Sequence, residues 1–168
     1  LNQNIEVITS NFKAGKIDAA VVWEPTASKL VEEGLARRVA SGVSVDEMDG
    51  AFMAMRQDLM AARPDVVKGW LRAELDAQLF IADPKNANEL VKLVLAQTTG
   101  FSDKTMFQAY YGQAPAAAGG TDIRNSLEFA MTPASMELIN RATAFLFSLK
   151  SINVEKLRPE AVMGQYAE

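Results

Sequence analysis

The sequence contains no cysteine and no histidine. Without cysteine, a disulfide framework, a thiol nucleophile and a thiolate metal site are excluded. Without histidine, the chain lacks the commonest general base near neutral pH and the commonest zinc ligand, which excludes histidine-dependent hydrolytic triads and zinc hydrolysis. A Gly-rich phosphate loop, a recognisable pair of carboxylates and a nucleophile elbow are also missing. We therefore expect no catalytic residue, metal or cofactor.

Positive charge is scarce as well. Seventeen basic and twenty-one acidic residues give a net charge of -4, and Arg37-Arg38 is the longest basic run, so we do not expect nucleic acid as a partner. No apolar run approaches the ~20 residues that span a bilayer. No signal peptide is visible after Leu1, and we expect a fragment or a processed form.

The remaining composition is that of an ordinary folded protein. The 168 residues are 49% apolar and 23% charged, the balance of a soluble globular chain. This length suits one domain, or one domain and part of another.

Three short apolar runs are predicted to be strands, at residues 19–23, 35–40 and 51–55. The first run is continuous, as in a strand that is covered on both faces, and Pro25 ends it. Helical spacing in residues 5–12 and 26–34 places helices before and after this run. Alternation of strands with helices predicts an α/β fold.

The rest of the chain is predicted to be mainly helical. Pro64 suits a first helical turn, and a helix is expected from there to Asp83-Pro84, followed by a second helix to Gly100. Ser102 is a predicted N-cap, and Thr132-Pro133 is predicted to start the last long helix. Residues 116–120 are expected to form a loop.

Several large apolar side chains at helical spacing are predicted to lie in the core. They include Trp70, the methionines and residues 145–147. The pair Tyr110-Tyr111 is also expected to pack, although a phenol can supply a polar tip to a ligand.

Trp23 and Glu24 are the strongest candidates for ligand contact. They follow the first predicted strand, and ligands bind at the carboxyl ends of strands in open α/β sheets. The indole could stack on a ligand or donate one hydrogen bond, and the carboxylate could pair with an ammonium group. Alternatively, Trp23 covers the core and Glu24 bonds the start of the next helix, where an acid is favoured. The residues themselves leave both interpretations open.

Gly50 precedes the third predicted strand. A glycine there would allow a ligand to approach the backbone closely, although a plain turn is the favoured interpretation. Asp18 lies in a tight connection and is expected to serve the turn.

The order of these features resembles the periplasmic receptors of ATP-binding-cassette importers for nitrate, alkanesulfonates and taurine. The resemblance covers residues 5–100 best. It rests on Gly15-Lys16-Ile17-Asp18-Ala19, Trp23-Glu24-Pro25, Gly34, the segment 50–56, and a helix that begins at Pro64-Asp65-Val66-Val67 and runs to Asp83-Pro84.

The resemblance implies a type II periplasmic-binding-protein-like bilobal α/β fold, of which this chain is the C-terminal portion with most of the first lobe missing. Residues 1–50 would be part of the second lobe, and residues 51–168 the crossing strand and a mainly helical segment returning to the first lobe. Trp23 and Glu24 match the loop that lines the cleft, while Asp49 and Gly50 match the connection back toward the first lobe.

The implied function is that of an extracytoplasmic substrate-binding component, periplasmic or lipid-anchored. It would bind a small anionic or zwitterionic solute, such as a sulfonate, taurine or nitrate, in the cleft between the lobes. Its partners would be that solute and the membrane permease of the importer, and a monomer is expected.

The sequence offers two alternative functions. The thiamine-pyrimidine synthase, an enzyme on a similar fold, depends on histidine and a cysteine-rich motif, and this chain has neither residue type. The other alternative is an interaction module without a small-molecule ligand, in which the helical second half docks on a partner.

Overall fold

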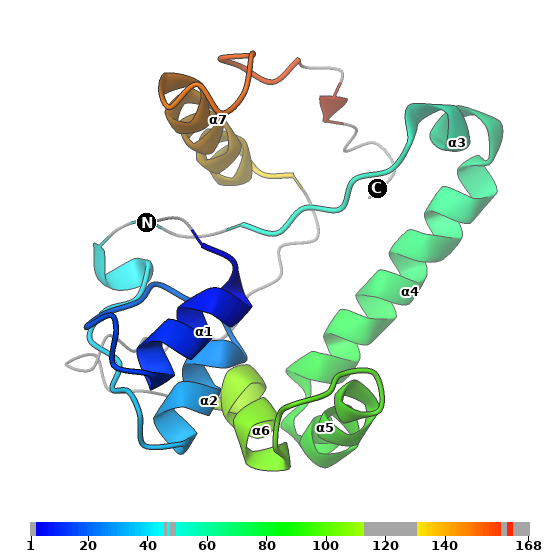
Figure 1. Cartoon of the computed structure of the whole chain (residues 1–168). Helices are drawn as coiled ribbons and strands as arrows, with labels where there is room; N and C mark the ends of the chain where they lie inside the picture. Colours follow the sequence, from blue (N-terminus) through cyan, green and yellow to red (C-terminus); the bar gives the residue numbers. More distant parts are fainter. Residues whose placement is uncertain (1–2, 46, 48–49, 113–130, 159–160, 163–168) are drawn as a thin grey trace. The chain divides into compact units, whose positions relative to one another are not determined.

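The computed structural model describes residues 3–45, 47, 50–112, 131–158 and 161–162. Within them, all regular secondary structure is helical (Figure 1). The helices are α1 (Ile5–Lys13), α2 (Thr26–Glu32), η1 (Val43–Val45), α3 (Gln57–Ala62), α4 (Pro64–Ala82), η2 (Pro84–Asn86), α5 (Ala87–Leu95), α6 (Asp103–Tyr111) and α7 (Pro133–Ser148), where η marks a 3₁₀ helix.

The chain forms two units, each of which is described by itself. Unit 1 comprises residues 1–45 and 84–125, and unit 2 comprises residues 46–83 and 126–168. Both units are therefore built from segments that are separated in the sequence. The lobe boundary expected after residue 50 stays a prediction.

Helix α1 begins and ends where the sequence predicts. The side chain of Asn4 accepts a hydrogen bond from the backbone amide of Val7 at 2.9 Å, which satisfies one amide of the first turn. At the other end, Gly15 has a φ of 65° and its amide bonds the carbonyl of Phe12 at 3.0 Å. This left-handed position favours glycine, because a Cβ would be strained there.

The later helix starts are also confirmed. Pro64 occupies the first turn of α4, where no intrahelical partner is needed for its missing N–H. Ser102 and Thr132 cap α6 and α7, and their hydroxyls accept from the amides of Thr105 and Ser135 at 3.0 and 3.2 Å. The loop predicted at residues 116–120 lies outside the described residues.

The predicted bilobal α/β fold is wrong, because the described residues contain no strand. Residues 19–23, 35–40 and 51–55 lie outside every helix and form no ladder with one another. Residues 17–22 make no backbone hydrogen bond to any described residue. An apolar run indicates a preference for burial, whereas a strand also requires a hydrogen-bonded neighbour, which periodicity does not predict.

Much of the predicted core is exposed. Val21 in the first apolar run is 95% exposed, and Val39 in the second is 63% exposed. The core positions expected at Trp70 and Phe145 are wrong as well, with exposures of 58% and 62%. Trp70 and Phe145 do lie in helices, as their spacing predicted. However, the structure covers only part of the apolar face of each of these helices.

The buried residues of unit 1 gather where α6 contacts both α2 and α5. Met106 of α6 is 2% exposed and Tyr111 is 8% exposed, so packing of these two residues is confirmed. The other buried side chains of this unit are Ser28 and Leu30 on α2, Ala87, Leu90 and Val91 on α5, and Thr105 on α6.

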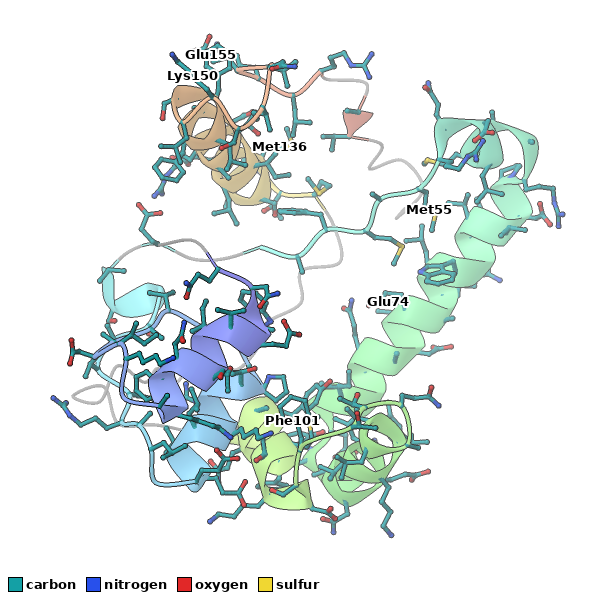
Figure 2. The ribbon with its side chains drawn as sticks, in the orientation of Figure 1. Met55, Glu74, Phe101, Met136, Lys150 and Glu155 are labelled. Carbon is teal, nitrogen blue, oxygen red and sulfur yellow. The ribbon has the colours of Figure 1, made fainter. Side chains whose placement is uncertain are left out.

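Lys29 ties α2 to the turn before α6. Its ammonium group donates to the carbonyl of Gly100 at 2.6 Å and lies 5.4 Å from the ring centre of Phe101, which is labelled in Figure 2. A cation at this distance from an aromatic face is attracted by the ring quadrupole. The residues joined in this way are 71 apart in the chain.

Glu32, at the end of α2, accepts hydrogen bonds from the start of α6. The hydroxyl of Ser102 donates to Oε2 at 2.7 Å, and the hydroxyl of Thr105 donates to the same oxygen. Thr105 is 2% exposed, so its hydroxyl needs a partner inside the protein. The hydrogen bonds from Thr105 and Ser102, with the positive charge of Lys104, lower the pKa of Glu32.

In unit 2, α3 contacts α4, where Val67 is only 1% exposed. Further along α4, the side-chain Nε2 of Gln78 donates to Oε1 of Glu74 at 3.1 Å, one helical turn away. Glu74 is labelled in Figure 2. On α7, Arg141 forms an ion pair with Glu47 at 2.8 Å. The Arg141–Glu47 ion pair links Glu47 to α7.

Replacing Leu30 by alanine tests the core between α2 and α6. Leu30 is 3% exposed, and removing a buried leucine side chain costs about 2–5 kcal/mol. Urea unfolding should show this loss. Leu93→Ala is the matched control because Leu93 is 55% exposed, and its effect should stay within about 0.5 kcal/mol. Equal losses in both variants would contradict the assignment of the core.

Glu32→Gln should destabilise unit 1 in a pH-dependent way. Because the folded pKa of Glu32 is lowered, its carboxylate contributes stability above the unfolded pKa, and this contribution is lost as the pH falls through the folded pKa. The melting temperature of the natural chain should exceed that of the variant at pH 7, and the gap should narrow below about pH 4.3. A gap that is constant from pH 7 to pH 3 would contradict this assignment.

Candidate solute-binding site

Both carboxylate oxygens of Glu24 are bonded within unit 1. Oε2 accepts from the backbone amide of Ser28 at 3.1 Å, and Oε1 accepts from Nη2 of Arg38. The same Nη2 also donates to the hydroxyl of Ser28 at 2.9 Å. We call Glu24, Ser28 and Arg38 the Glu24 network.

The local fold explains why these residues meet. Helix α2 follows Pro25 directly, and the amides of Ala27 and Lys29 bond the carbonyls of Trp23 and Pro25 at 3.2 and 3.0 Å. The backbone amide of Ser28, which lies between them, donates to the Glu24 side chain instead of to a backbone carbonyl. Ser28 is 5% exposed, so its amide and hydroxyl have little access to water and need such partners.

Trp23 directly precedes Glu24 in the chain and is open to solvent. It is 67% exposed, and its indole has no ring or hydrogen-bond partner among the residues the structure describes. The alternative interpretation, in which Trp23 covers the core, is therefore wrong. A large aromatic surface with a free N–H donor can stack on an organic group or bond to it.

The contact to Ser28 is the helix-start interaction that was one of the two interpretations of Glu24. It accounts for one oxygen of the carboxylate, while Arg38 accounts for the other. Contact of Glu24 with a ligand stays a prediction.

Sequence reasoning missed Arg38. It treated Arg37-Arg38 only as too short a basic run for nucleic acid, although two charges lie inside the apolar stretch Ala36-Arg37-Arg38-Val39-Ala40. A charge within such a stretch requires a partner if it is covered, and this was the available signal. The side chain of Arg38 is 31% exposed.

Gly50 lies close to α7. A Cβ on Gly50 would meet Cδ2 of Leu138 at 2.8 Å and Cε2 of Phe52 at 2.9 Å, so the space that glycine leaves is taken by these side chains. Gly50 belongs to unit 2, whereas Trp23 and Glu24 belong to unit 1. Asp49 lies outside the described residues, and the ligand contacts predicted for Asp49 and Gly50 stay predictions.

Unit 2 also carries an open depression of about 600 Å³ on α7. Pro133, Met136, Ala144 and Glu155 are among its lining residues, and Met136 and Glu155 are labelled in Figure 2. Arg141 also lines it, but its guanidinium is already paired with Glu47. The depression contains none of the predicted site residues, and we do not assign the solute to it.

Comparison with known proteins identifies the family. A model of the NMT1-like family matches residues 5–95, which is more than half of the 168-residue chain. The chain belongs to the NMT1-like family. Members are substrate-binding proteins of ABC transporters of the nitrate, sulfonate and taurine type, so the resemblance found in the sequence is confirmed at the level of the family. No curated protein and no solved structure matches the chain.

NMT1-like proteins are mostly non-enzymatic binding proteins that work with an ABC permease, and they are usually extracytoplasmic. Where the structure describes the chain, no helix has both the length and the apolar character that crossing a membrane requires.

Proposed function

We propose that this chain is the substrate-binding component of an ABC importer, and that it binds a small anionic or zwitterionic solute beside Trp23 and the Glu24 network. Family membership supports the transport role. The observation that carries the choice of site is the 67% exposure of Trp23 directly before a carboxylate that bonds Arg38. Trp23 and Glu24 are consecutive in the chain and Glu24 bonds Arg38, which supports a site with an apolar surface and two charged groups.

The chemistry of the site matches small polar solutes. An exposed indole can cover the organic part of a ligand, while charged groups nearby orient its polar end. Sulfonates, taurine and nitrate are the solutes that this chemistry and the family suggest. In this proposal the loaded protein acts outside the cytoplasm, either periplasmic or lipid-anchored, and delivers the solute to a membrane permease.

Titration calorimetry of the purified chain against alkanesulfonates, taurine, nitrate and aromatic carboxylates tests the proposal. At least one of these solutes should bind and raise the melting temperature, because a ligand that binds only the folded state stabilises it. If none of them binds or shifts the melting temperature, the chain is better explained as an interaction module without a small-molecule ligand.

Trp23→Ala tests the position of the site. Loss of the indole should weaken binding of the best solute by about two- to thirteenfold, since an aromatic contact is worth ~0.5–1.5 kcal/mol beyond its area. Trp70→Ala is the matched control, because Trp70 is also exposed, at 58%, and lies on α4 in unit 2. A larger effect from Trp70→Ala than from Trp23→Ala would place the site elsewhere.

A further inference from the structure

We infer that Arg38 is the residue that recognises the solute, that Glu24 positions Arg38, and that the solute class is an organic monoanion with an oxyanion head group, in preference to a zwitterion. This inference rests on the proposed function and names the solute class and the recognising group of the same site.

Both carboxylate oxygens of Glu24 already accept hydrogen bonds from the protein. A ligand ammonium group needs a carboxylate oxygen with room for a strong, charge-assisted hydrogen bond. Oε1 is engaged by the guanidinium of Arg38, and Oε2 by the amide of Ser28. A cationic group would have to compete with a cation that the protein already supplies. The charge of Glu24 is therefore balanced inside the site.

Arg38 has hydrogen-bond donors that the described residues do not use. A guanidinium carries five N–H donors. Arg38 uses Nη2 for both of its contacts, to Glu24 and to the Ser28 hydroxyl. Its Nε and Nη1 donate to none of the residues that the structure describes. Three donors thus remain for acceptor oxygens on a ligand.

The guanidinium of Arg38 is held in position by the protein. Two hydrogen bonds hold the guanidinium, one to Ser28 on α2 and one to Glu24, two residues before α2, while the side chain stays 31% exposed. A long side chain normally loses rotamer freedom when it binds a ligand, and that loss is smaller for a side chain that is already held. Arg38 is thus both accessible and preorganised.

Arg37 is the positive charge next to Arg38 in the chain. No ion pair joins it to any residue that the structure describes, whereas Arg38 pairs with Glu24. Exposure alternates from residue 36 to residue 39, with Arg37 on the exposed side and Arg38 on the half-buried side. Arg37 therefore adds charge without sharing the contacts of Arg38, which makes it a matched control.

The decisive comparison uses ethanesulfonate and taurine, which share a sulfonate and differ by an ammonium group. Titration calorimetry of the purified chain should show that ethanesulfonate binds at least as tightly as taurine. Taurine binding that is tenfold tighter would overturn the inference, because it would show a carboxylate available to the ammonium group.

Two variants separate recognition from general charge. Arg38→Gln should weaken ethanesulfonate binding by about tenfold or more, as expected for loss of hydrogen bonds from a charged group. Arg37→Gln should change it by less than twofold. Equal effects of the two substitutions would overturn the role of Arg38. If Arg38→Gln does not fold, Arg38→Lys keeps the charge, loses the guanidinium donors and should still weaken binding.

Glu24→Gln tests the positioning role. Acting through Arg38, the substitution should weaken ethanesulfonate and taurine by the same factor, whereas direct pairing with an ammonium group would weaken taurine alone. Selective loss of taurine would overturn the inference and leave the proposed function intact. If the natural chain binds no solute of the panel, the proposed function and this inference fall together.

Discussion

The fold of unit 1 depends on the junction where the end of α2 meets the start of α6. Glu32 accepts from Ser102 and Thr105, and Lys29 reaches the carbonyl of Gly100 from the same helix. These contacts join segments about seventy residues apart, in the unit where Leu30 and Met106 are buried. Helix α2 is thereby fixed, and the Glu24 network at its other end takes its geometry from that fixed helix.

Two carboxylates near opposite ends of α2 have different roles. Glu32, the last residue of α2, accepts from Thr105, whose hydroxyl is buried, so this contact is structural. Glu24, two residues before α2, accepts from Arg38 and follows the exposed Trp23 in the chain. The Glu24 contact leaves three donors of Arg38 unused by the described residues, and a held charge with unused donors is suited to a ligand.

Local signals in the sequence predicted the helices well, and they failed for the sheet. Gly15, Ser102 and Pro64 mark helix ends through their own backbone chemistry, so one residue suffices. A strand depends on a distant neighbour, and nothing in residues 19–23 specifies one. At the site, Trp23 and Glu24 were identified from their order in the chain. Arg38 was missed because its contact to Glu24 spans fourteen residues and follows from the path of the chain.

The discontinuous make-up of unit 1 also has a consequence for biosynthesis. Thr105 lies 73 residues after Glu32, and a ribosome adds roughly 5–20 residues per second, so α2 waits about 4–15 s for α6. During that interval Leu30 lacks the helix that covers it. The nascent chain therefore leaves the Leu30 side chain without its α6 partner until α6 has been made.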